Sequence, residues 1–332
     1  MDTQRLLLRI GAALISLSAC VIGCLYWSFI RSDTIHTTHA KPQFDISPSG
    51  KTIAIAYREK RNDGLLVFRY PFSAAEKVVQ VSGNIVEVCL LNDNQAVVSV
   101  RKRRDRESSE RYVYLVELDT GTMRRITSET RIWEANILRV SEDEFIFRQY
   151  SIRIYPNPLG WEIYGLEKSA LIFNTDSEET VLLTSSVDYI FSIVQILRDK
   201  RFVVLSYYTH QGKRWLLAEL NKPIDHSDAR IVRRHHLPIY SESLIADESG
   251  RFFFYLVNDP NKNTYEIHRF DRERNKTNRI VVFNNRIEQM KCTGKTLFFL
   301  TDSGYESLWC IRLDGTGLRH VADIRDFVSD MP

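Results

Sequence analysis

The sequence lacks the short motifs that mark the common catalytic centres. Its 332 residues contain no Gly-x-Ser-x-Gly turn, which carries the nucleophile of an α/β-hydrolase, and no Cys-x-x-Cys pair or zinc-ligand spacing. It also lacks an excess of charge of one sign, because 45 Lys and Arg stand against 42 Asp and Glu, a net charge of +3. We therefore expect no serine hydrolase chemistry, no cofactor, no metal site and no binding of nucleic acid.

Cysteine and histidine pairs form no clear ligand set. Cys292 and Cys310 fall in the same predicted repeat unit, so a disulfide between them is geometrically conceivable, although the order of the turns does not force the two residues together. His235 and His236 are adjacent, and adjacent side chains on a strand point to opposite faces, so this pair is a poor chelate. The sequence leaves the disulfide open and disfavours a histidine metal site.

What the chain does contain is a strand-and-turn unit that recurs six times between about Lys41 and Asp323. Its first half is clearest at 44–56 (FDISPSGKTIAIA) and 244–256 (LIADESGRFFFYL), where a Ser-Gly turn and a basic residue precede an apolar run. Weaker copies of this turn lie at Asn92–Asn94, Ser141–Asp143, Arg198–Lys200 and Cys292–Gly294. Because repeats define architecture, this unit decides the fold class.

Each unit indicates a small antiparallel meander, because β-branched and aromatic residues alternate with Gly, Asn, Asp and Pro turns. The turns recur about every 43 to 57 residues, in the range of four-stranded propeller blades. Most of the closing strands carry more charge than the inner strands, as expected for outer edges. We predict an all-β, six-bladed β-propeller over residues 42–325, with a seven-bladed one as the alternative, and a C-terminal tail at 326–332.

The repeat text resembles that of a known family. The segments 45–54 (DISPSGKTIA) and 308–321 (LWCIRLDGTGLRHV) are similar to the TolB-type propeller repeat, which also occurs in the N-terminal propellers of the dipeptidyl peptidase IV and prolyl oligopeptidase families. Resemblance to TolB implies a periplasmic protein-binding platform, whereas resemblance to the peptidase propellers implies a domain that gates a hydrolase. We expect no hydrolase domain here, because the sixth unit lies close to Pro332.

A single apolar segment precedes the repeats. Ile10 to Ile30 contains no charged residue, and about 21 residues rise about 31 Å as a helix, which matches the hydrocarbon thickness of a bilayer. Arg5 and Arg9 precede the segment, which favours a cytoplasmic N-terminus. We therefore predict a cytoplasmic tail at 1–9, a transmembrane signal anchor at 10–30 and a linker at 31–41. The propeller would then lie on the periplasmic side of the inner membrane.

A lipoprotein signal is the alternative for this segment. Leu17-Ser-Ala-Cys20 resembles a bacterial lipobox, in which the cysteine becomes lipidated after cleavage. The residues after Cys20 stay apolar through Ile30, however, whereas a mature lipoprotein begins with a polar tether. Anchor, lipoprotein and simple cleavage all place the propeller beyond the membrane.

Two irregular stretches are the candidate partner-binding sites. The first is a basic run between two strands of the second unit, where Asp105, Glu107 and Glu110 compensate part of the charge of Arg101, Lys102, Arg103, Arg104 and Arg106. Such a run would attract an acidic partner or anionic headgroups. The second is an insert in the third unit, Tyr155-Pro-Asn-Pro-Leu-Gly-Trp161, whose Pro-x-Pro should keep it out of a central strand and leave Tyr155 or Trp161 on a loop.

The sequence thus favours a membrane-anchored, extracytoplasmic propeller that binds a protein partner in a bacterial envelope. A propeller enzyme of the lactonase or lyase type, with its chemistry in an axial pocket, is the alternative. Residues from different blades can meet at an axis without any signature in the sequence, so the alternative stays open at this level.

Overall fold

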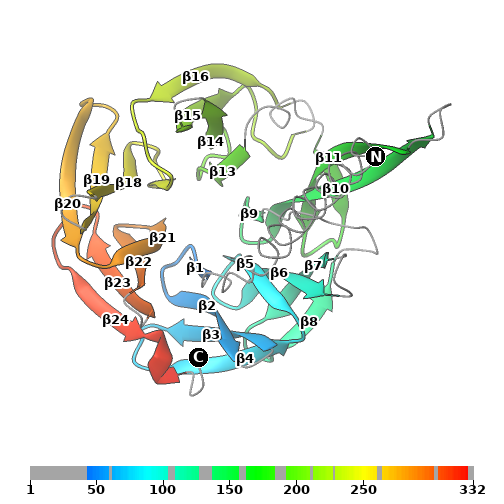
Figure 1. The fold of residues 1–332 in the computed structure, drawn as a ribbon, viewed down its shortest axis with the longest axis horizontal. Helices are drawn as coiled ribbons and strands as arrows, with labels where there is room; N and C mark the ends of the chain where they lie inside the picture. Colours follow the sequence, from blue (N-terminus) through cyan, green and yellow to red (C-terminus); the bar gives the residue numbers. More distant parts are fainter. Residues whose placement is uncertain are drawn as a thin grey trace, which may run out of the picture. The chain divides into compact units, whose positions relative to one another are not determined.

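The computed structural model describes residues 43–59, 62–103, 109–126, 137–156, 162–183, 192–209, 212–226, 229–259, 264–302 and 306–327. The strands within these ranges form six antiparallel sheets, each made of four consecutive strands (Figure 1). All belong to one unit, 42–332. The predicted six-bladed propeller is therefore confirmed.

Each blade begins with its innermost strand and ends with its outermost strand. Blades 1 and 2 contain β1 (Phe44–Ile46), β2 (Thr52–Glu59), β3 (Asn62–Arg69), β4 (Ala75–Val81), β5 (Asn84–Leu90), β6 (Gln95–Arg103), β7 (Ser109–Glu117) and β8 (Thr122–Arg125). Blades 3 and 4 contain β9 (Leu138–Arg139), β10 (Glu144–Pro156), β11 (Glu162–Asn174), β12 (Thr180–Leu183), β13 (Ser192–Ile196), β14 (Phe202–Thr209), β15 (Gly212–Leu220) and β16 (Ile231–Leu237). Blades 5 and 6 contain β17 (Leu244–Ala246), β18 (Phe252–Asp259), β19 (Thr264–Asp271), β20 (Lys276–Phe283), β21 (Arg286–Thr293), β22 (Thr296–Asp302), β23 (Glu306–Arg312) and β24 (Arg319–Asp323), before the 3₁₀ turn η1 (Ile324–Phe327).

The second strand of blade 1 shows why the inner strands are continuous apolar runs. Successive side chains of a strand point to opposite faces, and in a propeller both faces pack on a neighbouring blade. Ile53 and Ile55 pack in a cluster with side chains of blade 6, whereas Ala54 and Ala56 pack in a cluster with side chains of blade 2. Both faces are buried, so alternation of apolar and polar residues is lost there.

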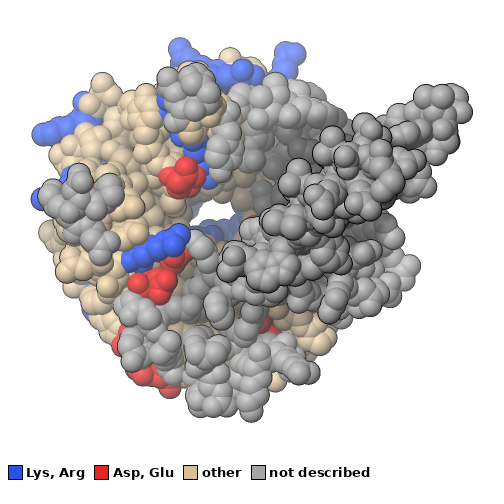
Figure 2. All heavy atoms as spheres, viewed as in Figure 1, with Lys and Arg blue, Asp and Glu red and all other residues tan. Residues whose placement is uncertain are grey.

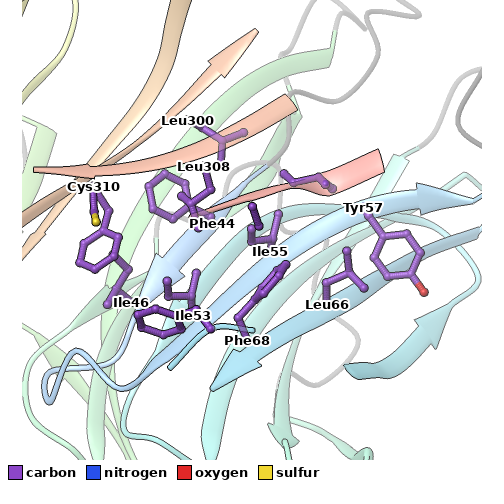
Figure 3. Packing of buried hydrophobic residues seen from close by; sticks show 14 residues of the cluster. Phe44, Ile46, Ile53, Ile55, Tyr57, Leu66, Phe68, Leu300, Leu308 and Cys310 are labelled. Carbon is purple, nitrogen blue, oxygen red and sulfur yellow. The ribbon is translucent and has the colours of Figure 1, made fainter. Parts of the chain in front are cut away.

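The ring closes between blades 1 and 6 through side chains. The inner strands contact one another in sequence from β1 to β21, and β21 contacts β1. Among the described strands, none is exchanged between these blades, because β1–β4 form one sheet and β21–β24 another. Instead, Phe44 and Phe68 of blade 1 pack with Leu300 and Leu308 of blade 6, each fully buried (Figure 3). Each such side chain contributes about 2–3 kcal/mol by burial. This closure excludes the seven-bladed alternative.

The last described turn completes the same cluster. Ile324 is fully buried in it, and the ring of Phe327 lies edge-on to Phe68 with centroids 5.2 Å apart. Phe327, which was predicted to lie in the C-terminal tail, thus packs on the junction between blades 1 and 6.

The turns between the first two strands of each blade join neighbouring blades on one face. Gly50, Gly250 and Gly294 occupy these turns with φ of 72°, 65° and 54°, a region that favours glycine. Polar ties then cross all six junctions: Ser49 Oγ to Asp93 Oδ1 (2.6 Å), Asn92 Nδ2 to Glu142 O (3.2 Å), Lys200 Nζ to Glu144 Oε2 (3.0 Å), Arg198 to Glu248 (3.7 Å), Gly294 N to Glu248 Oε1 (3.2 Å) and Thr293 Oγ1 to Pro48 O (2.9 Å).

The predicted N-terminal anchor lies in a part of the chain that the structure does not describe. Residues 1–42, with the predicted anchor 10–30, the linker 31–41 and Cys20, lie outside the described ranges. Within those ranges no helix has the length and hydrophobicity to cross a bilayer.

Cys292 and Cys310 are free thiols, because β22 lies between their strands and the two side chains enter different clusters. The disulfide that the sequence leaves open is therefore absent between these two residues.

Candidate functional site

The inner strands carry polar side chains that bond the backbone of the next blade. Asp45 Oδ2 accepts from Leu90 N at 2.8 Å, which ties blade 1 to blade 2. Glu87 Oε2 accepts from Ile137 N at 3.3 Å, which ties blade 2 to blade 3. The free edge of each inner strand faces the propeller axis, so its N–H groups need such partners.

Two glutamines repeat this arrangement at later junctions. Gln195 accepts from Ala246 N (2.8 Å) and donates to Ala246 O (2.9 Å), which ties blade 4 to blade 5. Gln289 Oε1 accepts from Phe44 N at 3.0 Å, which ties blade 6 to blade 1. We call Asp45, Glu87, Gln195 and Gln289 the axial pins.

Three of the axial pins follow a β-bulge. The register of the inner pair shifts between Ile85 and Glu87, between Ile193 and Gln195, and between Ile287 and Gln289. A bulge re-aims the side chain that follows it. These bulges lie in blades 2, 4 and 6, so alternate blades share the same local device.

One axial pin also belongs to a cluster of charges. Asp45 Oδ1 lies 3.0 Å from Lys291 Nζ, and Arg139 Nη1 donates to Ile46 O (3.2 Å) and Leu90 O (2.7 Å). Burial lowers the pKa of Lys291, but the Asp45 carboxylate outweighs this and leaves that pKa raised. The cluster therefore holds four blades together with charge-assisted bonds. Atoms of both charge signs lie beside the opening near the centre of the face in Figure 2.

The thiol beside this cluster is not an activated nucleophile. Cys89 is buried on β5, and burial, reinforced by the Asp45 carboxylate, raises its pKa to about 12. A thiol attacks as its thiolate, and at neutral pH this group stays protonated. Burial likewise raises the pKa of Cys292. Across the described residues, no group of three or more His, Cys, Asp or Glu side chains is placed to hold a metal ion.

Blade 6 brings together a serine, a histidine and an aspartate, but in an order that differs from a hydrolase triad. Asp323 Oδ1 accepts from Ser307 Oγ and lies 2.9 Å from His320 Nε2. The hydrogen bond from Ser307 and that from His320 hold the pKa of Asp323 below its usual range. A triad requires the histidine between serine and aspartate, so that it can accept the serine proton. Here the aspartate is central, and the cluster ties β23 to β24.

A second carboxylate–histidine pair lies on β19. Glu266 Oε2 is 2.7 Å from His268 Nε2, and Glu266 Oε1 accepts from Arg279 Nη1 at 3.0 Å. The hydrogen bond from His268, with that from Arg279, lowers the pKa of Glu266. Both oxygens of this carboxylate are therefore engaged, which suits a structural tie between β19 and β20.

The first three residues of the basic run predicted as a partner site, Arg101, Lys102 and Arg103, are the last residues of β6. Arg101 lies opposite Arg111, Lys102 opposite Glu110 and Arg103 opposite Ser109. The basic run thus begins within the paired strands β6 and β7, and not in a loop between them. Arg104 and Arg106 lie outside the described residues.

The predicted loop at Tyr155–Trp161 is shorter than expected. Tyr155 and Pro156 belong to β10, where they pair with Ile163 and Glu162. The prediction that Pro156 stays out of a central strand is wrong, because Pro156 is the last residue of β10 and pairs with β11. Proline is tolerated at this position because β9 pairs only with the opposite end of β10, so the missing N–H of Pro156 faces no third strand. Trp161 lies outside the described residues.

A basic surface that the sequence had not predicted lies on the outer strand of blade 4. β16 exposes Val232, Arg233, Arg234 and His236, and pairs with β15 alone. In Figure 2, blue atoms gather along the edge where β15 and β16 lie in Figure 1. Residues 192–237 contain nine Lys and Arg against four Asp and Glu, so blade 4 carries +5 and the rest of the chain −2. Counting charge by repeat unit would have revealed it.

The aromatic and cationic groups around β16 are already packed. The guanidinium of Arg214 stacks on Tyr240 at 3.7 Å from the ring centroid, and Lys213 Nζ lies 4.6 Å from that of Trp215. Tyr207 Oη lies 3.2 Å from His236 Nδ1. The Tyr207–His236 contact thus links β16 to β14, and the Arg214–Tyr240 contact links β15 to the segment that follows β16.

Comparison with known proteins supports the fold. The sequence matches no protein-family model and no curated protein. The structure is similar to TolB from Acinetobacter baumannii, with a TM-score of 0.56 and 11% identity over 81% of this chain and 62% of TolB. It is also similar to the AtxE2 isopeptidase, with a TM-score of 0.51 and 10% identity over 86% of this chain and 51% of the isopeptidase. The chain thus spans less than two thirds of either structure. The resemblance of the repeat to TolB-type propellers is confirmed at the level of fold.

Proposed function

We propose that this propeller is a protein-binding module. The observation that carries the proposal is the concentration of positive charge on one blade of a chain that is otherwise close to neutral, +5 against −2. A charge of one sign gathered on one surface steers a partner of the opposite sign and fixes its orientation. Resemblance to TolB-type propellers supports the same class of function.

The polar side chains near the propeller axis are engaged in bonds between blades, which favours a binding site at the perimeter. Asp45, Glu87, Gln195 and Gln289 bond the backbone of the neighbouring blade, and Lys291 is paired with Asp45. A ligand at the axis would have to compete with these bonds. An outer strand such as β16 offers its groups to a partner without disturbing the ring.

We further propose that the segment 10–30 anchors the chain in the inner membrane, with the propeller on the periplasmic side. The uncharged stretch of about 21 residues and the preceding Arg5 and Arg9 support this orientation. Protease added to spheroplasts should digest the propeller while the cytoplasm stays sealed. Protection of the propeller under these conditions would contradict the proposed orientation.

Two further contact sites belong to the proposal. Charge reversal of Arg103 and Arg104 to Glu should reduce the recovery of a crosslinked partner, and Trp161→Ala should do the same with an almost unchanged thermal midpoint. Full recovery with the reversed pair would remove the β6–β7 hairpin from the binding surface. A large loss of stability in Trp161→Ala would instead assign that side chain to packing.

Co-purification of the full chain from detergent-solubilised membranes tests the function itself. We expect one or a few proteins to be enriched reproducibly, after crosslinking in intact cells, over a matched membrane protein. Purified chain that carries a stoichiometric cation and no enriched protein would favour an enzyme with an axial site.

A further inference from the structure

β16 is among the longer outer strands of the described residues. β8 and β12 have four residues each and β24 has five, whereas β4 and β16 have seven and β20 has eight. β16 lies at the end of its sheet, and its register with β15 shifts between Ile231 and Arg233. Val232, Arg233, Arg234 and His236 are exposed on it. It therefore combines length, an open edge and exposed positive charge.

The charge of β16 lies on both faces of its blade. Arg233 and Arg234 are neighbours on the strand, so their side chains point to opposite faces, and both are exposed. Between Ala229 and Tyr240 the chain contains three Arg, two His and no acidic residue. Across the sheet, Glu219 lies opposite Arg233, whereas Ala218 lies opposite Arg234. One carboxylate thus faces the basic stretch from β15.

We propose that β16 binds an extended acidic segment of a partner protein, which adds to blade 4 as a fifth strand. The inference rests on the proposed function and names the surface and the chemistry of the partner. Backbone N–H and C=O groups along an open edge pair with an added strand, and the side chains select the sequence. Positive charge normally protects an edge from self-pairing. It equally selects a segment rich in Asp or Glu.

The geometry favours an extended peptide over a membrane surface. A bilayer attracts charges that point in one direction toward one plane, whereas Arg233 and Arg234 point to opposite faces of the blade. A strand lying beside β16 reaches both faces, because its own side chains alternate in the same way. Val232, which is 57% exposed, would pack against an apolar side chain of that strand.

Binding of a defined peptide tests the inference. The probe is a fluorescein-labelled twelve-residue peptide of alternating Glu and Val, and its affinity for the soluble propeller, residues 42–332, or for the full chain in detergent is measured by fluorescence anisotropy. The double variant R233E/R234E should lose affinity by roughly tenfold or more. The control variant R274E/K276E makes the same change in net charge in blade 5 and should keep wild-type affinity. Lys276 is the first residue of the outer strand β20, Arg274 lies two residues before it, and both are exposed. Thermal midpoints of all variants verify folding.

A second probe separates strand addition from simple attraction. The same peptide with every second backbone nitrogen methylated keeps its charge and loses the N–H groups of one edge. We expect it to bind at least roughly tenfold more weakly. Equal binding of the methylated and unmethylated peptides would overturn strand addition, and so would equal loss in the two double variants. A third outcome would assign β16 to the membrane instead. In that case the wild-type chain binds phosphatidylglycerol vesicles but not the peptide, and R233E/R234E weakens its binding to the vesicles.

Failure of this inference is distinguishable from failure of the proposed function. If R233E/R234E still co-purifies with the wild-type set of partners, the chain binds proteins through another surface and the role of β16 is refuted. If the wild-type chain enriches no protein at all, the proposed function fails first.

Discussion

A lysine in an unfavourable backbone conformation provides a sharp test of how the blades are joined. Lys200 occupies the turn position that Gly50, Gly250 and Gly294 fill in other blades, and its φ is 58°. The left-handed region costs a residue with a Cβ about 1–2 kcal/mol. Lys200 Nζ lies 3.0 Å from Glu144 Oε2 of blade 3 and 2.8 Å from Asp225 Oδ2. The ion pairs offset the strain and tie blade 3 to blade 4.

The expected changes in the free energy of unfolding follow from the exposure of the three paired side chains and from the backbone conformation of Lys200. The three side chains are 26%, 23% and 25% exposed, so after allowance for screening the two ion pairs together contribute about 1–2 kcal/mol. Lys200→Ala loses this contribution and keeps the strain, so its free energy of unfolding should fall by about 1–2 kcal/mol. Lys200→Gly also loses the pairs but relieves the strain, against about 0.5–1 kcal/mol of added chain entropy. It should therefore be more stable than Lys200→Ala by about 0.5–1 kcal/mol.

Urea unfolding of the propeller, residues 42–332, measures these differences. Lys276→Ala, an exposed lysine in blade 5, is the control and should change stability by less than about 0.5 kcal/mol. Burial lowers the pKa of Lys200, but hydrogen bonds to Asp225 and Glu144 outweigh it and raise that pKa. The advantage of wild type over Lys200→Ala should thus persist below about pH 10.4 and be lost as pH rises through the folded-state pKa. Lys200→Ala as stable as wild type, or more stable than Lys200→Gly, would refute the reasoning.

Two further predictions concern the axis. Asp45→Asn should lower the free energy of unfolding by about 2–4 kcal/mol, because it leaves the ammonium of Lys291 without its counter-charge in a largely buried cluster; an effect below about 1 kcal/mol in urea unfolding would contradict the role of this pair. Cys89, whose pKa is raised to about 12 by burial, should resist iodoacetamide at pH 8 in the native chain and react after denaturation, as read by peptide mass spectrometry; rapid native labelling would show that the thiol is accessible and ionised.

The sequence predicted the blade count because the turn residues carry local physical requirements. Gly50, Gly250 and Gly294 recur where the chain needs φ > 0, and their spacing sets the repeat. Lys200 obscured the fourth copy, because its strain is balanced by carboxylates of other strands, which no local pattern reveals. The length of β10 was missed for a similar reason: Pro156 is tolerated where no third strand pairs.

The candidate sites were harder to predict than the fold. The axial pins Asp45, Glu87, Gln195 and Gln289 come from four different blades, and their bonds reach residues about 45 to 245 positions away in the chain. Such partners are set by ring closure, which sequence spacing does not encode. β16 was visible as Arg233-Arg234-His235-His236, yet its meaning depends on its place at the outer edge of the sheet.

Photocrosslinking from β16 in intact cells tests the central claim most directly. A photoreactive amino acid in place of Val232, which is 57% exposed on β16, is compared with the same substitution at Val282, which is 43% exposed on the outer strand of blade 5. We predict a discrete adduct from position 232 alone, with the crosslink mapped to a segment of the partner rich in Asp and Glu. Equal adducts from both positions, or an adduct from position 282 alone, would contradict the assignment of protein binding to blade 4.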